Sequence, residues 1–472
     1  MPKKFHTMTG VACLALWPGL ASAAAIDGAS LSMLWGVPFA GVLLSIALLP
    51  LLAPVVWHHH FGKITAAWAL AFLVPFAVVF GMEAAFVNFV HALLAEYLPF
   101  VILLTALFVV AGGIYIRGSL QGTPLLNTGI LAIGAVLASF MGTTGASMLL
   151  IRPLLRANVQ RSRMAHIVVF FIFVVSNAGG SLTPLGDPPL FLGFLKGVPF
   201  NWTLLHIWPE TLFLVLILLA LFFVLDTWML RNEGASLRPH PQPDSHERLG
   251  FDGKFNFVLL GVVVGLVLMS GVWKSDVVFD IAGTEVGLPG LVRDLGLIAV
   301  TVISLLTTAR RVHEANQFSW DPMFEVAKLF AGIFLTIIPV IAMLKAGTEG
   351  PFASIVRAVT RADGSPDPAM YFWATGALSS FLDNAPTYLV FFNTAGGDVA
   401  QLTTSMATTL AAISAGAVFM GANTYIGNAP NMMVKAIAED RGVRMPSFFG
   451  YMLWSSGILI PLFVVMTFIF FR

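Results

Sequence analysis

The sequence predicts an all-α polytopic membrane protein with two inverted-topology repeats, each of about five transmembrane helices (one broken) plus a re-entrant hairpin. Three observations predict this class: the composition, the spacing of the apolar segments, and a pair of polar motifs that occurs twice. Of the 472 residues, 58% are hydrophobic and 10% are charged, whereas a soluble domain has about 25% charged residues. Most of the protein surface is therefore expected to face lipid.

Apolar segments long enough to cross a bilayer recur along the whole chain. About 20 apolar residues form one crossing, so the sequence contains roughly ten spans. They are expected at 31–56, 64–80, 98–116, 165–195, 208–229, 254–273, 290–309, 325–345, 402–436 and 449–471. Arg152, Glu210 and Asp226 lie near the ends of apolar segments, so their side chains are expected to reach the membrane surface.

The first residues have the pattern of a secretory signal. A positive start (Lys3 and Lys4) precedes the apolar residues 11–20 and a small-residue cleavage site at 21–23. An uncleaved first helix is the alternative, which the shortness of the apolar run disfavours. We therefore expect a signal peptide at 1–23 and a multi-pass protein of the bacterial inner (cytoplasmic) membrane.

The remaining segments suggest how each repeat is built. Two segments consist of a pair of apolar arms around a turn, and neither arm is expected to be long enough to cross a bilayer. Two spans are too long for one helix and contain polar stretches with glycine and proline. The expected parts are a first repeat at 24–230 with a hairpin at 123–155 and a broken helix at 165–195, a cytoplasmic linker at 231–253, and a second repeat at 254–472 with a hairpin at 370–396 and a broken helix at 402–436.

The hairpin turns and the helix breaks each occur twice. Residues 139–146 (SFMGTTGA) align without gaps on 380–387 (SFLDNAPT). Residues 180–189 (GSLTPLGDPP) align on 421–430 (GANTYIGNAP) with the same offset of 241 positions (424 − 183). A duplicated polar element inside an apolar chain is typical of secondary transporters built from two repeats. Most Lys and Arg residues fall on one side if the halves have opposite topology, so the repeat is expected to be inverted.

The breaks and turns carry the residues that we expect to bind ions. Non-helical backbone at membrane depth exposes carbonyl oxygens and helix N-termini, which are ready ion ligands. Hydroxyl, amide and carboxylate oxygens are hard ligands that suit sodium or protons rather than soft metals. The expected ion-binding residues are Asp187, Asp383, Asn177, Thr183, Asn384, Thr387, Asn423, Thr424, Asn428, Thr143 and Thr144.

The most specific hypothesis concerns Asp187 and Asp383, which are both expected to bind sodium. Burial raises the pKa of a carboxyl group, whereas a nearby cation lowers it. One such group can therefore hold a proton or a sodium ion in turn, which is the simplest form of antiport. The alternative is that both residues cap helices, because prolines follow each of them. The threonines have an alternative role too, since threonine often bonds only to its own helix.

Four stretches give the chain a family resemblance: GTTGASMLLIRPLL, SNAGGSLTPLGDPPLFLGFLKGVPF, FLDNAPTYLVFFN and GANTYIGNAPNMMVKAIAE. With them the chain resembles NhaD-type sodium/proton antiporters and their citrate transporter relatives in the ion transporter superfamily, from about residue 30 to the end. The resemblance implies two inverted repeats, each with a re-entrant hairpin and a broken helix. It also implies a homodimer in which a transport domain moves as an elevator against a scaffold domain.

The expected function is sodium (or lithium)/proton antiport through the intramembrane aspartates, with no cofactor other than the transported ions. The alternative is transport of citrate or another di- or tricarboxylate, coupled to cations or protons. Related dicarboxylate symporters have Ser-Asn-Thr at the hairpin turns, where this chain has Gly-Thr-Thr-Gly and Asp-Asn-Ala-Pro. The four duplicated motif segments contain neither Lys nor Arg, which disfavours an anionic substrate at these positions.

Other classes of protein fit the sequence less well. An intramembrane aspartyl protease needs glycine two residues before its Gly-Asp pair, where this chain has Pro184. The sequence contains no metalloprotease, serine hydrolase or nucleotide-binding motif, and its single cysteine excludes a disulfide framework. A passive channel is possible, but broken inverted repeats favour alternating access. The expected partners are small ions or a small anionic solute, the lipid bilayer and a second copy of the chain, with no nucleic acid.

Overall fold

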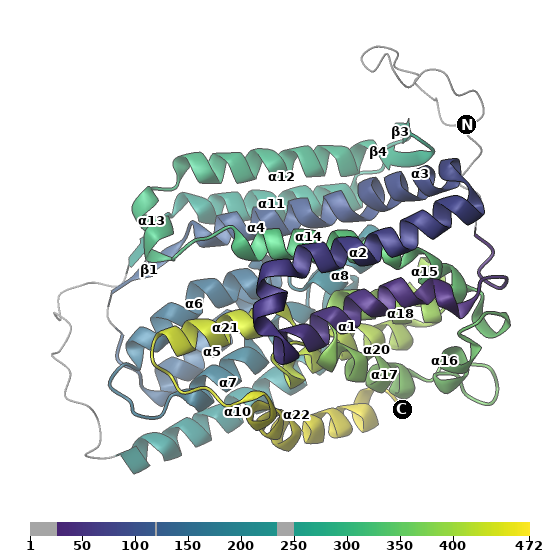
Figure 1. The fold of residues 1–472 in the computed structure, drawn as a ribbon. Helices are drawn as coiled ribbons and strands as arrows, with labels where there is room; N and C mark the ends of the chain where they lie inside the picture. Colours follow the sequence, from purple (N-terminus) through teal and green to yellow (C-terminus); the bar gives the residue numbers. More distant parts are fainter. Residues whose placement is uncertain (1–25, 119, 234–249) are drawn as a thin grey trace. The chain divides into compact units, whose positions relative to one another are not determined.

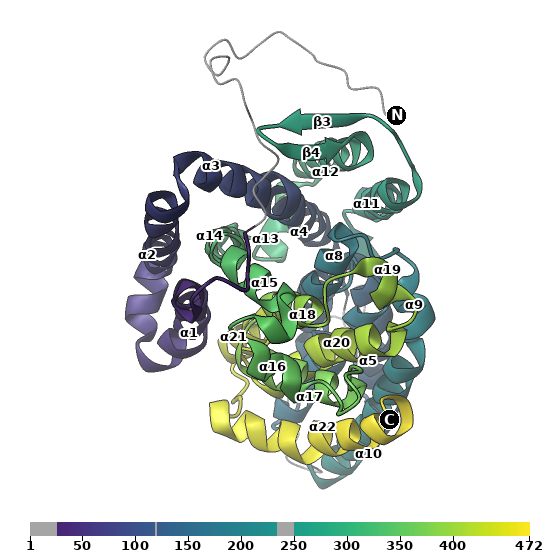
Figure 2. The same cartoon turned by 90° about the vertical axis from the view of Figure 1, so that its right-hand side faces the viewer.

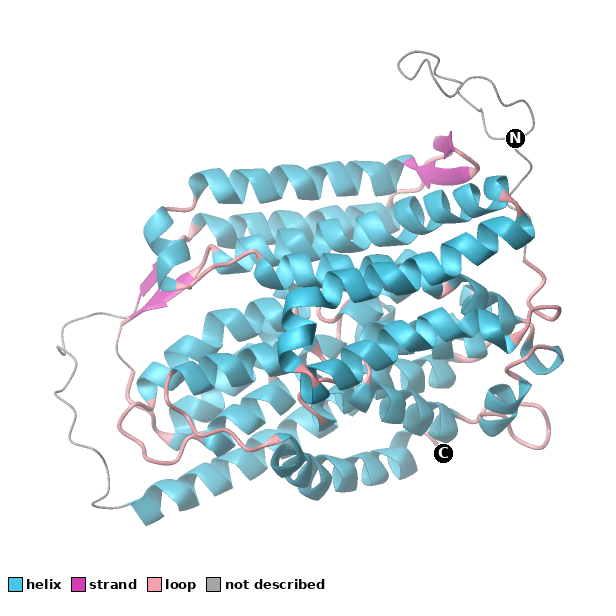
Figure 3. Ribbon diagram, in the orientation of Figure 1, coloured by secondary structure: helices cyan, strands magenta, loops and turns pink. Residues whose placement is uncertain are grey.

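The computed structural model describes residues 26–118, 120–233 and 250–472, so the expected signal peptide and most of the linker lie outside the described residues. Helices dominate this part of the chain, and its strands form two short pairs (Figure 3). Eight of the described helices are long and apolar enough to cross a membrane, or nine if one bent pair counts as a single span. The prediction of an all-α polytopic membrane protein is confirmed.

The chain forms two compact units, and each unit combines segments from both halves of the sequence. Of the described residues, the first unit contains those up to Ala106, Gly265–Val300 and Trp320–Val356, and the second contains those within Leu107–Val264, Thr301–Ser319 and Arg357–Arg472. The boundary passes through three long helices, α4 (Leu98–Gly112), α11 (Phe255–Val272) and α12 (Leu288–Thr307), and through the short α16 (Ala353–Ala358), most of which lies in the first unit.

The first unit is built from long apolar helices, of which α1, α2 and α14 pack against one another (Figure 1). A 44° bend separates α14 from α15 at a proline in the first turn of α15. Besides the three long shared helices, the elements are η1 (Met33–Gly36), α1 (Val37–Leu52), α2 (Pro54–Phe80), α3 (Met82–His91), a π-helical turn η2 (Ala92–Tyr97), β3 (Val278–Ile281), β4 (Thr284–Gly287), α14 (Asp321–Thr336), α15 (Ile338–Lys345), η5 (Gly347–Glu349) and α16 (Ala353–Ala358).

Two spans of this unit begin earlier than the sequence predicts. Helix α2 begins at Pro54 rather than near residue 64, because proline at the first helical position lacks only an amide that would be unpaired anyway. The third span begins at Met82 rather than at residue 98 and continues to Gly112. Polar residues such as Glu96, which is buried, lower the local hydropathy and hide the start of this span from the sequence.

The second unit contains both helix hairpins and both broken helices. Its strands β1 (Tyr115–Arg117) and β2 (Gly250–Asp252) pair antiparallel. Its other elements are α5 (Pro124–Met141), α6 (Thr143–Ala157), α7 (Ala165–Val174), η3 (Ala178–Ser181), α8 (Pro188–Leu195), α9 (Trp202–His206), α10 (Trp208–Glu233), α13 (Arg310–Ala315), α17 (Pro368–Phe381), α18 (Asn384–Thr394), α19 (Val399–Thr403), α20 (Ala407–Met420), η6 (Gly421–Asn423), α21 (Ala429–Asp440) and α22 (Phe448–Phe470).

The first hairpin consists of α5 and α6, and the second consists of α17 and α18. Gly142 forms the first turn with φ +80°, a conformation that glycine adopts without strain. Helices α17 and α18 have 14 and 11 residues. Helix α5 has 18 residues and is apolar enough to cross a membrane by itself. The prediction that neither arm of a hairpin reaches spanning length is therefore wrong for α5.

Each broken helix is interrupted next to a hairpin of its own half. In the second half, α20 lies beside α17 and α18 (Figure 2). The first break (residues 175–187) separates α7 from α8, and the second break (421–428) separates α20 from α21. Both contain a short 3₁₀ turn, and both resume as a helix with proline in the first turn. The turn and the proline explain why neither segment continues as one helix.

The same hydrogen bonds join break to hairpin in both halves. The hydroxyl of Thr183 donates to the carbonyl of Ser139, and the hydroxyl of Thr424 donates to the carbonyl of Ser380 at 2.5 Å. The hydroxyls of Ser139 and Ser380 donate in turn to backbone carbonyls of η3 and the end of α20, at 2.6 and 3.1 Å. The duplication in sequence is therefore also a duplication of local structure.

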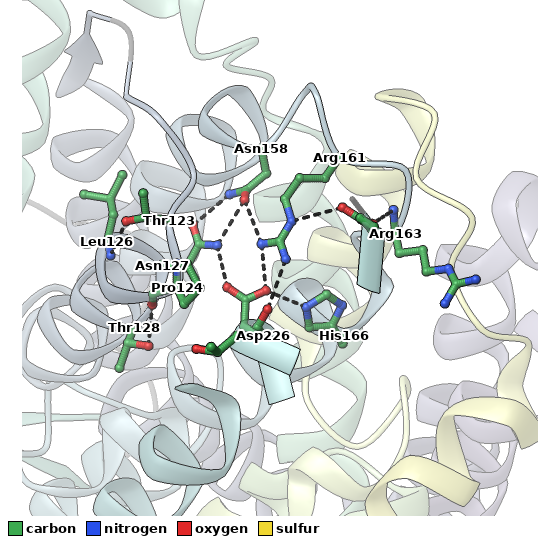
Figure 4. Close-up of polar contacts among 12 residues, drawn as sticks. Thr123, Pro124, Leu126, Asn127, Thr128, Asn158, Arg161, Arg163, His166 and Asp226 are labelled. Carbon is green, nitrogen blue, oxygen red and sulfur yellow. Dashed lines mark hydrogen bonds and ion pairs between the residues drawn. The ribbon is translucent and has the colours of Figure 1, made fainter. Parts of the chain in front are cut away.

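A buried charged cluster joins four segments of the second unit near their ends (Figure 4). Asp226 of α10 is fully buried, forms an ion pair with Arg161 at 2.6 Å and lies within hydrogen-bond distance of His166, at 2.7 Å. It also accepts a hydrogen bond from Asn127 of α5 at 3.0 Å, and Asn127 exchanges hydrogen bonds with Asn158 after α6. The prediction that Asp226 reaches the membrane surface is therefore wrong.

Candidate functional site

Asp187 lies where the first broken helix resumes, and its side chain is 1% exposed. Its backbone is extended, and α8 begins at the next residue. The side chain does not cap α8, because Pro188 and Pro189 have no amide proton to donate. The first available amide, that of Leu190, bonds instead to the backbone carbonyl of Asp187 at 3.0 Å. The capping interpretation therefore fails for this carboxylate.

Three side chains from other segments bind the Asp187 carboxylate. The Thr143 hydroxyl of the first hairpin donates to Oδ1 at 3.0 Å. Asn428 of the second break donates to the same oxygen at 3.2 Å, and Asn384 of the second hairpin donates to Oδ2 at 2.5 Å. All three partners are uncharged, so only dipoles stabilise a negative charge that is removed from solvent.

Asparagine side chains connect the two breaks directly. Asn428 also donates to the carbonyl of Ser176 at 3.1 Å and to Oδ1 of Asn177 at 3.2 Å. Asn177 donates to Oδ1 of Asn431 at 2.8 Å, and Asn431 donates to two carbonyls of the second break. Asn431 is absent from the residues that the sequence predicts. Its position three residues after Asn428, on the same helix face, was the available signal.

Two buried amide oxygens lack a hydrogen-bond partner among the described residues. They are Oδ1 of Asn384, whose amide nitrogen binds Asp187, and Oδ1 of Asn423, whose amide nitrogen donates to Ser380 at 2.9 Å. Buried polar atoms are nearly always paired, so these two oxygens need an explanation. Amide oxygens are ligands that hard cations use.

Asp383 differs from Asp187 in its surroundings. Its side chain caps α18 by accepting the amide of Ala385 at 3.1 Å, and the residue is half-buried. The capping interpretation therefore holds for Asp383. Its carboxylate nevertheless lies close enough to Asp187 to interact with it electrostatically, because Asn384 next to it binds Asp187 directly.

The predicted threonines differ in what they contact. Thr143 binds Asp187, whereas Thr183 and Thr424 hold the breaks against the hairpins and also accept backbone amides at 3.2 Å. The hydroxyl of Thr387 donates to the carbonyl of Asp383 one turn back, at 2.9 Å. Thr144 is half-buried beside the first turn. Among the threonines, the structure thus brings only Thr143 into hydrogen-bond contact with a carboxylate of the site.

The breaks leave no space for a side chain at Gly186. A Cβ atom there would overlap the carbonyl of Gly180. We expect Gly186→Ala to push the break apart and to destabilise the protein by about 1–3 kcal/mol, seen as a lower midpoint in thermal unfolding of the purified protein. Gly129→Ala on α5 is the control, since a Cβ there meets nothing within 4 Å. Equal midpoints for both variants would show that the break tolerates a methyl group.

Comparison with known proteins gives the family. The family described as "Putative citrate transport" matches residues 28–471. Uncharacterized transporters of Mycobacterium bovis and Mycobacterium tuberculosis are each 29% identical over 339 residues, which cover 68% of this chain and 71% of the relative. An uncharacterized transporter of Synechocystis is 22% identical over 361 residues, 72% of this chain and 76% of the relative. The chain therefore belongs to the family described as "Putative citrate transport" and is a multi-pass membrane transporter.

Proposed function

We propose that the protein is a sodium (or lithium)/proton antiporter of the bacterial inner membrane and that Asp187 binds the two cations in turn. The supporting observation is a buried carboxylate whose three side-chain partners are all uncharged. A proton or a metal cation supplies the missing positive charge. Because one carboxylate holds either cation but not both, the binding of one releases the other.

Asn384 gives this exchange a local mechanism. With Asp187 ionised and no cation bound, the amide nitrogen of Asn384 faces the carboxylate. Rotation of the carboxamide by half a turn exchanges its nitrogen and oxygen. The oxygen, which lacks a partner in the structure, would then accept the proton of a neutral Asp187 or bind a sodium ion. Asn423, Asn428 and Thr143 would complete the oxygen ligands.

The arrangement of the proposed ligands suggests which part of the chain moves. The side chains that bind Asp187 come from both hairpin and break elements, and all of them belong to the second compact unit. We infer that the second unit is the transport domain, the first unit is the scaffold, and the two repeats have inverted topology. A homodimer held by the scaffold units fits this proposal.

Inverted membrane vesicles from a host without its own antiporters test the proposal. Respiration builds a pH gradient, which a fluorescent probe follows while sodium, lithium, potassium or citrate is added. We expect sodium and lithium to collapse the gradient, in contrast to vesicles without the protein. A gradient that no cation disturbs would exclude antiport.

Citrate or another di- or tricarboxylate is the second candidate substrate, favoured by the description of the family. The carboxylates of Asp187 and Asp383 would repel such an anion unless a cation lay between them. Uptake of labelled citrate into the same vesicles, with and without sodium, separates the two functions. Uptake without any cation-induced collapse of the gradient would make citrate the substrate.

Asp383→Asn separates the capping role of this residue from an ion role. Asparagine caps helices as well as aspartate does, so α18 should persist. We expect exchange to be abolished, because the negative charge beside Asp187 is lost. Asp367→Asn is the matched control, since Asp367 caps α17 by accepting two backbone amides. Wild-type exchange in the Asp383 variant would leave that residue with a capping role alone.

A further inference from the structure

Arg152 of α6 is buried, with 5% of the residue exposed. The prediction that it reaches the membrane surface is therefore wrong. Its Nη2 donates to Oε1 of Gln317 at 3.3 Å, which is near the upper limit for a hydrogen bond. Its Nε and Nη1 are also buried, and neither has a hydrogen-bond partner among the described residues. A buried guanidinium with unpaired donors is strongly unfavourable unless an anion binds it.

The charges around Arg152 make its unpaired, buried guanidinium still less favourable. The two side chains that act on it electrostatically are Arg156, one turn further along α6, and Arg441 at the end of α21. Both are positive and therefore repel it. Arg156 is already bound, since it donates to the hydroxyl of Tyr115 at 3.0 Å and to the carbonyl of Ile116 at 2.5 Å. Arg152 thus has free donors inside a positive field.

Gln317, the residue that binds Arg152, belongs to a loop at the protein surface. It is exposed, and its backbone has φ +50°, which side chains other than glycine rarely adopt. The neighbouring Asn316 is buried and fixes this loop by donating to the carbonyls of Gly112 and Ile114, at 2.8 and 2.7 Å. The one hydrogen-bond partner of the Arg152 guanidinium among the described residues is therefore an exposed side chain at 3.3 Å.

We propose that Arg152 binds an oxyanion, the carboxylate or phosphate group of a ligand that displaces Gln317. Displacement frees Nη2, which can then act together with Nε or with Nη1 in a two-point contact of the kind that guanidinium groups make with oxyanions. Arg441 and Arg156 attract the ligand by their charge. The oxyanion belongs either to a soluble organic acid or phosphate, or to the headgroup of an anionic lipid. This site is independent of the proposed antiport.

Thermal unfolding of the full-length protein in nanodiscs tests the proposal, because a ligand of the folded state raises the unfolding midpoint. In phosphatidylcholine nanodiscs, citrate, phosphate and chloride are compared at equal ionic strength. Nanodiscs that contain phosphatidylglycerol are measured without added oxyanion. We expect citrate or phosphate, or else phosphatidylglycerol, to raise the midpoint of the wild-type protein.

Arg152→Met keeps an apolar chain of similar length but removes the guanidinium charge. This variant should show no rise of the unfolding midpoint with oxyanions or phosphatidylglycerol. Arg310→Met is the control, since Arg310 is exposed and pairs with Glu314. If the Arg152→Met variant does not fold, Arg152→Lys is measured in its place. Lysine keeps the positive charge but cannot make a two-point contact, so the same rise of the midpoint should require at least about tenfold more oxyanion. A rise with soluble oxyanions identifies a soluble ligand, and a rise only with phosphatidylglycerol identifies a headgroup. Equal midpoints in all conditions, or a rise that persists without Arg152, would overturn the proposal.

Discussion

Replacing Asp187 with asparagine is expected to lower cation/proton exchange by at least about 100-fold, while the protein remains folded. Asparagine has nearly the same volume, and its oxygen can still accept the hydrogen bonds of Thr143 and Asn428. Its amide nitrogen would face that of Asn384, and rotation of the Asn384 side chain relieves this conflict. The substituted side chain is neutral in every state, so it cannot alternate between a proton and a metal ion.

The exchange is measured as collapse of the pH gradient in inverted vesicles that contain equal amounts of each variant. Size-exclusion chromatography of the detergent-extracted protein shows whether the variant is folded. Asp398→Asn is the matched control, since Asp398 is exposed and caps α19. Exchange at the wild-type rate in the Asp187 variant would remove this residue from the transport mechanism, and with it the main support for the proposed function.

Asp226→Ala is expected to be the most destabilising of the proposed substitutions, by about 3–5 kcal/mol. It removes the anion that pairs with Arg161 and is hydrogen-bonded to His166, and both of these side chains are buried. Glu233 lies 3.7 Å from Nε of Arg161 and compensates only in part. The cluster joins α5, α7 and α10, so its loss should loosen the helices that carry the site.

The fraction of monodisperse protein after heating measures this loss of stability. The double variant Asp226→Leu with Arg161→Met is the informative comparison, because replacement of both partners by apolar residues removes the unpaired charge. We expect the double variant to recover most of the lost stability. If Asp226→Ala and the wild-type protein have the same midpoint, the cluster does not stabilise the fold.

The sequence predicts the class of the protein because composition and the length of apolar segments reflect its contact with lipid. It also locates both helix breaks, since glycine and proline limit the backbone locally. The start of the span at Met82 is missed because a buried Glu96 counts against an apolar window. Local patterns of this kind predict helices well only where polar residues face the surface.

The partners of the site residues are less predictable, because they depend on contacts between distant segments. Asn431 is missed because its counterpart in the first repeat is the apolar Leu190. Comparison of the two repeats therefore gives no sign that this position is polar. Arg152 and Asp226 have partners 165 and 60 residues away in sequence. Because both residues lie near the ends of apolar segments, the sequence predicts that they are exposed. Other elements pack over them, so both are buried.

The equivalent positions Asp187 and Asn428 explain how a duplicated structure can hold a single charge. Their side chains meet, and the amide of Asn428 donates to Oδ1 of Asp187 at 3.2 Å. Aspartate in both copies would bring two carboxylates to this distance, and they would repel each other. Asparagine in both would leave this pair of positions without a charge. Divergence of the two copies at this one position thus converts a symmetric arrangement, in which like groups would oppose each other, into a complementary pair of acceptor and donor.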